Sequence, residues 1–161
     1  MENKPHSSFP GVSSLNEKKK VRVLKELVNF LIYCQKRQFF YIGLDAENVF
    51  NDSEGNIKVL PNLCGELNPE LQTPEEKVIG YGDKSEAFRV GLLISKIFFI
   101  ENEICIQNDE WLTGNIPVFN TPIQEKYSKM VQIIVELTSA IPKYRLSLGK
   151  LLLELENYNF Y

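Results

Sequence analysis

Residues 83–98 are the feature that most limits how this chain can fold. The segment opens with Asp83 to Glu86, a pattern that can cap the start of a helix. Apolar and small residues then recur at helical spacing: Ala87, Val90, Gly91, Ile94 and Phe98. A helix that is apolar over most of its circumference has to be covered on all sides. The sequence therefore predicts a helix in the middle of a domain.

An earlier segment has the pattern of a helix buried along one side. Ser14 to Glu17 fits a capping box, with Ser14 as N-cap, and the helix is expected to run to about Arg37. Its apolar stripe is Val21, Leu24, Leu27, Val28, Leu31 and Cys34. The Lys18–Lys20 run could form an anion site, but the solvated start of a helix is the simpler interpretation.

Two later segments also combine a helix start signal with an apolar stripe at helical spacing. Thr121 as N-cap, Pro122 and Gln124 mark a helix start. The stripe behind it is Tyr127, Met130, Ile134 and Leu137. The last helix is expected from about Ser147, with Leu148, Leu151, Leu152 and Leu155 inward. Residues 101–120, between these helices and the central one, read as a mixed loop.

Residues 49–60 predict a β-hairpin. Val49-Phe50 and Ile57 to Leu60 are β-prone runs, and the polar residues between them include Gly55. Asp52 and Glu54 lie in this turn, where solvated turn residues are a better interpretation than a metal site. The expected fold class is therefore mainly α with a small β-hairpin.

Composition narrows the class of protein. The chain has 161 residues, of which 43% are apolar and 24% charged, as in an ordinary globular domain. A net charge of −3 gives no basic field for nucleic acid or an anionic membrane. No apolar stretch reaches the roughly 20 residues that a bilayer crossing needs. We expect a flexible leader over residues 1–13 and one domain over residues 14–161.

The cysteines and the histidine indicate the cellular compartment and whether a zinc site is expected. Cys34, Cys64 and Cys105 are odd in number and widely spaced, which favours free thiols and a reducing compartment. A cytoplasmic protein is expected, with the nucleus as the alternative. His6, the single histidine, lies in the leader, so neither a zinc site nor a histidine base is expected.

Residues 41–60 resemble a known family. Tyr41 to Phe50 and the following hairpin are similar to the catalytic loop and hairpin of eukaryotic protein kinases, whose pattern is His-Arg-Asp-Leu-Lys-Pro-Glu-Asn. Leu44, Glu47 and Asn48 match that pattern. The resemblance implies the C-terminal lobe of the protein-kinase-like fold, with residues 14–37 as the long helix before the catalytic loop.

Other motifs of the same family follow in order. Residues 84–91 resemble Lys-Ser-Asp-Val-Trp-Ser-x-Gly of its central helix, with Glu86 at the aspartate and Arg89 at the serine. The resemblance implies that the Glu86 carboxylate braces the backbone of the catalytic loop. Thr73-Pro74-Glu75 resembles Ala-Pro-Glu, and residues 141–147 resemble Pro-x-x-Arg-Pro-Ser. In the family these two motifs form a buried ion pair, which implies that Glu75 pairs with Arg145.

The residues that carry kinase chemistry are replaced. The proton-accepting aspartate of the family falls at Gly43, the loop lysine at Asp45 and the magnesium-binding aspartate at Pro61. Asn48 is retained, but one amide does not hold magnesium against the phosphate charges. No glycine-rich loop or strand lysine precedes residue 14, so an N-lobe is not expected. We therefore expect no catalysis, no nucleotide or metal cofactor, and no catalytic residue.

Three functions remain open at this stage. The first is a pseudokinase C-lobe that binds or inhibits a protein partner, similar in logic to the kinase non-catalytic C-lobe domain. The partner could be a true kinase, whose C-lobe the chain would mimic, or a basic peptide, which the acidic charge of the chain would suit. The second is a residual or partner-completed Ser/Thr protein kinase that uses Asp45 and Asn48. The third is a structural remnant with no partner. The sequence indicates no oligomeric state.

Overall fold

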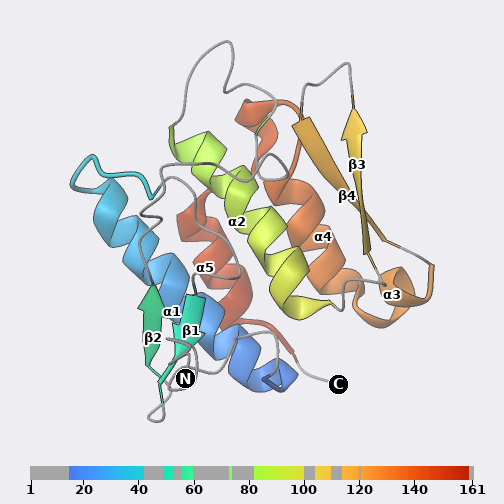
Figure 1. The fold of residues 1–161 in the computed structure, drawn as a ribbon, viewed down its shortest axis with the longest axis horizontal. Coiled ribbons are helices and arrows are strands. Elements are labelled where there is room, and N and C mark those ends of the chain that lie inside the picture. Colours follow the sequence, from blue (N-terminus) through green and yellow to red (C-terminus); the bar gives the residue numbers. More distant parts are fainter. Residues whose placement is uncertain are drawn as a thin grey trace, which may run out of the picture.

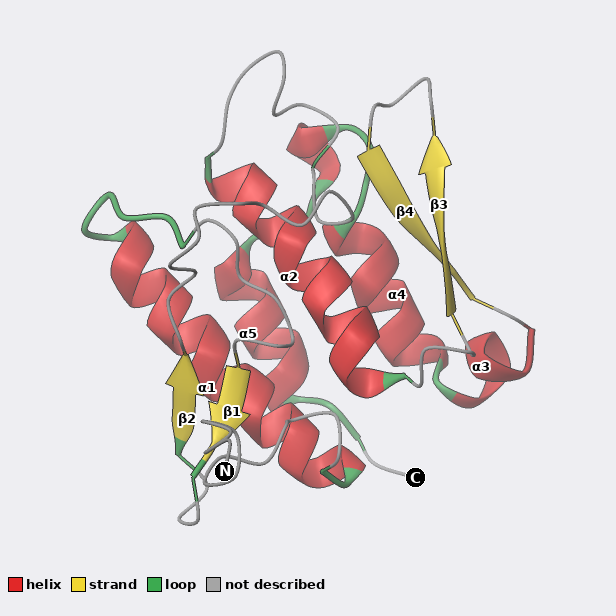
Figure 2. Cartoon of the chain, in the orientation of Figure 1, coloured by secondary structure: helices red, strands yellow, loops and turns green. Residues whose placement is uncertain are grey.

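A computed structural model describes residues 15–41, 49–52, 56–59, 73, 82–99, 104–109, 114–119 and 121–159. The leader predicted at residues 1–13 lies outside these ranges. In the described part the fold is mainly α, with two small antiparallel hairpins (Figure 1, Figure 2). In chain order the elements are α1 (Glu17–Gln35), β1 (Val49–Asn51), β2 (Ile57–Val59), α2 (Asp83–Phe98), β3 (Ile104–Asp109), β4 (Gly114–Phe119), α3 (Thr121–Lys126), α4 (Ser128–Leu137), η5 (Pro142–Tyr144) and α5 (Leu148–Glu156).

The central helix that the sequence predicts is α2. From Ser85 to Phe98 every residue except the half-exposed Lys96 is buried. This helix packs against α1, α4, β4 and η5, so neighbours cover it on several sides (Figure 1). The Ser85 hydroxyl accepts a hydrogen bond from the Gly82 N–H at 3.2 Å and so supports the helix start. The prediction of a helix in the middle of the domain is confirmed.

Gly91 lets α2 and α4 approach each other closely. A Cβ atom at this position would lie 2.6 Å from Thr138 Cγ2 and 2.9 Å from Leu137 Cβ. The Thr138 hydroxyl donates to the Ile134 carbonyl at 2.8 Å, which fixes the rotamer that aims Cγ2 at α2. Leu137 Cβ is fixed by the backbone of α4. The absent side chain of Gly91 therefore sets the distance between the two helices.

Helix α1 lies beside α5 and also contacts α2 and β2. All six residues of its predicted stripe are buried, so the predicted face is confirmed. The predicted cap is wrong: Asn16, not Ser14, is the N-cap, and its Oδ1 accepts from the Lys19 N–H at 2.9 Å. Asparagine caps a helix as well as serine does, and two overlapping cap patterns cannot be separated by sequence alone.

The hairpin predicted at residues 49–60 forms. Val49 pairs with Val59 and Asn51 with Ile57 in antiparallel register. Asp52 acts as a turn residue, as predicted, because its Oδ1 accepts from the Asn56 N–H at 2.9 Å. Val49 is fully buried and joins the main apolar core, so the hairpin is attached to the helical body.

Two predictions about residues 101–137 are wrong. The expected loop contains β3 and β4, which pair from Ile104↔Phe119 to Asp109↔Gly114. Pro117 lies within β4, and a two-stranded sheet tolerates it because both of its strands are edges. The single helix expected from Thr121 is divided into α3 and α4 at Tyr127, whose backbone has φ −120° and ψ 35°. Phe98 and Phe99 each make an edge contact with the Tyr127 ring.

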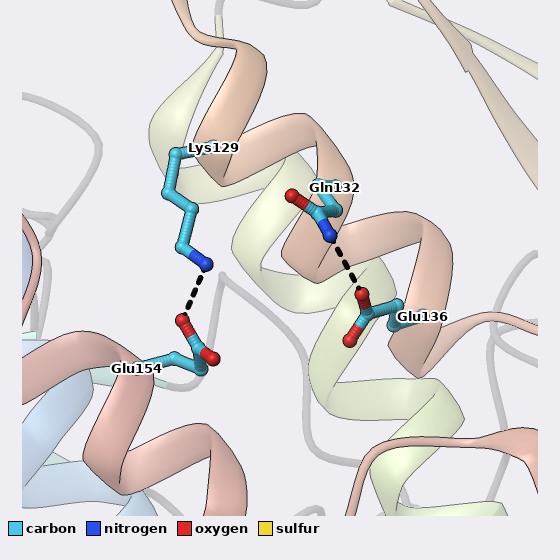
Figure 3. A network of polar contacts seen from close by, with 4 residues as sticks. All are labelled: Lys129, Gln132, Glu136 and Glu154. Carbon is cyan, nitrogen blue, oxygen red and sulfur yellow. Dashed lines mark hydrogen bonds and ion pairs between the residues drawn. The ribbon is translucent and has the colours of Figure 1, made fainter.

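The last helix matches its prediction. Ser147 is the N-cap of α5 and accepts from the Lys150 N–H, while Leu148, Leu151 and Leu155 are buried. At the surface, Lys129 of α4 and Glu154 of α5 point toward each other and form an ion pair at 2.6 Å (Figure 3). Such an exposed pair contributes at most about 1 kcal/mol, so the buried leucines hold α5 in place.

Gly91→Ala should lower the free energy of unfolding by about 1–3 kcal/mol, because the new methyl group overpacks the α2–α4 contact. Gly149→Ala is the matched control. A Cβ there meets nothing within 4 Å, so helix propensity should make that variant more stable by about 0.5–1 kcal/mol. Urea unfolding of both variants measures the two changes. Equal stability of Gly91→Ala and the wild type would contradict the close approach.

Candidate functional site

Most of the sequence-predicted site residues cannot be placed. Gly43, Asp45, Asn48, Pro61 and Glu75 all lie outside the described residues. The loss of catalytic groups and the Glu75–Arg145 pair therefore remain predictions. Of the segment that resembles the catalytic loop, the structure describes Tyr41, which lies near the end of α1 and the first turn of α2.

Glu86 ties this region together. Its side chain is 1% exposed, and its Oε2 accepts a hydrogen bond from the Tyr41 backbone N–H at 2.9 Å. Its Oε1 accepts from Gln35 Nε2 at 2.8 Å. One carboxylate of the central helix thus holds the end of α1 and the backbone that leads into residues 42–48. The hydrogen bond to Oε2 fixes the position of the Tyr41 backbone relative to α2.

The charge on Glu86 is costly in this environment. Burial raises the pKa of the carboxyl, and the hydrogen bonds from Tyr41 and Gln35 and the positive charge of Arg89 oppose this rise. Asp83, in the same helical turn, adds to the rise. Burial also raises the pKa of the neighbouring Cys34 thiol, and the Glu86 charge adds to it. Cys34 is therefore a packed, protonated thiol rather than a nucleophile.

Arg145 serves as a second anchor for the start of α2. It is 3% exposed and donates from Nη1 to the Lys84 carbonyl and from Nε to the Ser139 carbonyl, both at 2.8 Å. Its guanidinium lies over the Phe88 ring, 4.7 Å from the centroid. The Lys84 ammonium in turn donates to the Arg145 carbonyl at 3.4 Å. Arg145 therefore joins the segment before α5 to the central helix.

An aromatic surface lies beside the Glu86 anchor. It consists of Phe30, Tyr33 and Phe39, whose side chains are 36%, 55% and 54% exposed. The half-buried Tyr41 ring contacts both Phe30 and Phe39 edge to face, with centroids 6.3 Å apart in each case. Since Glu86 holds the Tyr41 backbone, the aromatic surface is attached to the central helix. Exposed aromatic groups of this kind are typical of protein contact sites.

Sequence reasoning missed this surface and the role of Gln35. Phe30 and Tyr33 fall outside the buried stripe of α1, and their spacing of three residues on a helix was the available signal. Gln35 gives no such signal, because only the folded chain brings it near residue 86. The Glu86 position was found through the family resemblance.

No family model matches the sequence, and no curated protein matches it. None of the helices in the described ranges combines the length and apolar character needed to cross a bilayer. The described residues also hold no group of three histidine, cysteine or acidic side chains that could ligate a metal ion.

Glu86→Ala should be less stable than Glu86→Gln by about 1–3 kcal/mol, since alanine leaves the Tyr41 N–H without its acceptor. Glutamine keeps an acceptor oxygen for Tyr41, and the Gln35 amide can turn to match its amino group. Thermal and urea unfolding measure the difference. Equal loss in both variants would show that the Tyr41 contact has no role in stability.

The raised pKa also sets a pH dependence. Unfolded Glu86 titrates near the ordinary value of about 4.3, and the folded protein holds the proton more tightly. Its contribution to stability is therefore greatest below the ordinary pKa and declines as the pH rises through the folded pKa. We expect the wild type to lose stability relative to Glu86→Gln as the pH rises from about 4 to neutrality. Urea unfolding of both proteins across this pH range measures the difference in their unfolding free energies.

Proposed function

We propose that this chain is a catalytically inactive module similar to the C-terminal lobe of protein kinases, and that it binds a protein partner. The contact between Glu86 and the Tyr41 N–H carries the proposal. The family resemblance implies a carboxylate at residue 86 that braces the backbone of the catalytic loop. A buried carboxylate at that position, hydrogen-bonded to the backbone N–H of the first residue of the loop-like segment, supports this interpretation.

Further features support the same scaffold. The helix around Gly91 is central, as the family's equivalent helix is expected to be, and a hairpin follows the loop segment. Arg145, which the resemblance pairs with Glu75, is buried and donates to the Lys84 carbonyl at the start of α2. The binding role is supported by the aromatic surface, which a catalytic scaffold without its catalytic groups can still present. Regulation of a true kinase is one form that such binding could take.

The expected Glu75–Arg145 pair gives a direct test of the kinase-like scaffold. Removal of one partner of a buried ion pair costs on the order of 3–5 kcal/mol. Glu75→Ala and Arg145→Ala should each lower the melting temperature, and the double variant should lose clearly less than the two single losses added together. Strict additivity in urea unfolding would show that the two residues do not interact. Arg145→Ala alone is not decisive, because it also breaks the Lys84 and Ser139 contacts.

Affinity capture tests the binding function. The full chain, immobilised and exposed to a lysate of its source cells, should retain a protein that a Tyr33→Ala/Phe39→Ala variant does not. Both side chains are more than half exposed, so the variant should keep the melting temperature of the wild type. Leu153→Ala, at an equally exposed apolar residue on α5, is the matched control and should retain the partner.

A second measurement separates this function from that of a residual or partner-completed Ser/Thr kinase. ATP with magnesium should leave the melting temperature of the chain unchanged, and it should stabilise the complex with a captured partner no more than it stabilises that partner alone. A nucleotide at a hundred times its dissociation constant would stabilise the fold by about 2.7 kcal/mol, which a thermal shift detects. A clear shift would favour the kinase alternative, and capture of the same proteins by all variants would overturn the binding surface.

A further inference from the structure

The exposed face of α1 has a charge pattern that its own fold does not use. Residues 17–37 hold seven of the eighteen lysines and arginines of the chain but two of its twenty-one acidic residues. The five charged residues in this segment that are exposed are all cations: Lys18, Lys19, Arg22, Lys36 and Arg37. Among the described residues, none of these five is in an ion pair.

Both acidic residues of α1 are turned to the body of the protein. Glu17 accepts from the Tyr158 hydroxyl at 3.3 Å, and Glu26 accepts from the Ile57 N–H of β2 at 3.3 Å. Neither of them is fully exposed. The two acidic groups of α1 itself are therefore engaged in contacts away from the exposed face.

The cations and the aromatic surface lie on one side of the helix. Positions 18, 22, 25, 29, 33 and 36 follow each other by three or four residues, which places them along a single face. Phe30 and Tyr33 lie between the cations at the two ends. Figure 1 shows α1 at the edge of the helical body, with α5 and the β1–β2 hairpin as its neighbours. We call this the basic face: Lys18, Lys19, Arg22, Phe30, Tyr33, Lys36 and Arg37.

Helix stability does not explain the whole pattern. Lys18 and Lys19 lie in the first turn of α1, where the positive end of the helix dipole disfavours cations by about 0.3–1 kcal/mol each. The last turn of α1, where cations would stabilise the helix, has none. Lys36 and Arg37 follow directly after α1, where a cation is favourable, so the helix dipole accounts for these two cations but not for Lys18 and Lys19.

Contacts with Tyr33 order the side chain of Arg37 in a position from which it can bind an anion. Its guanidinium stacks 3.6 Å from the centroid of the Tyr33 ring, and Nη1 donates to the Tyr33 carbonyl at 3.3 Å. A guanidinium has five N–H donors, so most of them stay available to a bidentate carboxylate. Stacking removes part of the entropy cost of ordering the side chain on binding.

We propose that the basic face binds a short acidic segment of a partner protein, one that places aspartate or glutamate against the cations and apolar side chains against Phe30 and Tyr33. This inference rests on the proposed function, because it takes the partner to be a protein. Charge complementarity argues for the acidic segment, in place of the basic peptide that the net charge alone suggested.

The dimensions and the charge of the chain argue against a long polyanion. The distance from Lys18 to Lys36 is about 27 Å at 1.5 Å per residue, which an extended peptide of about eight residues spans. The rest of the sequence has more acidic than basic residues, so nucleic acid that extended beyond α1 would be repelled. An anionic membrane surface would need an apolar face to insert, and the apolar face of α1 is buried.

Peptide selection tests the proposal with the full chain. A phage library of random peptides of about twelve residues, long enough to span the face, is selected on the immobilised wild type. The recovered peptides should be enriched in aspartate and glutamate. Their affinity, measured by fluorescence anisotropy, should fall about tenfold or more for Lys18→Glu/Arg22→Glu and weaken with salt. Glutamate near a helix start is favourable, so that variant should keep its fold.

The control carries the same change of charge elsewhere. Lys143→Glu/Lys150→Glu reverses two exposed cations of η5 and α5 and should bind the peptides as the wild type does. Peptides without acidic enrichment, equal binding to the Lys18/Arg22 variant, or tighter binding of single-stranded DNA or phosphatidylserine vesicles would each overturn the proposal. A captured protein that the Lys18/Arg22 variant still retains would overturn this surface alone and leave the proposed function standing.

Discussion

The structure depends on the burial of α2 around nearly its whole circumference. A polar side chain buried in such a helix needs a partner inside the protein, and Ser95 and Glu86 find theirs in two different ways. Ser95 donates back to the Gly91 carbonyl of its own helix at 2.9 Å, whereas Glu86 accepts from the end of α1 and from the Tyr41 backbone. The close contact at Gly91 aligns α4 with the same helix. Packing and polar satisfaction therefore position the neighbouring elements together.

This arrangement links the core to the surface that we propose for binding. The aromatic side chains Phe30, Tyr33 and Phe39 are exposed, but the segment that carries them ends at a backbone N–H held by a buried carboxylate. Ordering such side chains in advance lowers the entropy cost of binding. The acidic residues of α1 contact the body of the protein, whereas five of the seven cations in residues 17–37 are exposed. A chain that is acidic as a whole thus presents a local basic face.

Much of the fold could be predicted from the sequence, because the buried positions of a helix or strand carry apolar residues at a regular spacing. The stripes of α1 and α5, the all-round apolar pattern of α2 and the first hairpin all appear in the structure with small shifts at the ends. The second hairpin is harder to predict from the sequence, since Pro117 lies within its second strand and proline is rare in strands. The break at Tyr127 leaves no signal in the sequence, because the helical period continues across it while ring contacts with Phe98 and Phe99 accompany the bend.

For the site, the sequence by itself determined which groups are present: a carboxylate at residue 86, an arginine at 145, and a run of cations and aromatics in residues 18–39. Only the tertiary structure decided which of them meet. The hydrogen bonds from Gln35 and Tyr41 to Glu86 span 51 and 45 residues, and that from Arg145 to Lys84 spans 61. Local sequence fixes the period of a helix, but contacts over such separations depend on how the helices pack, which no local pattern encodes.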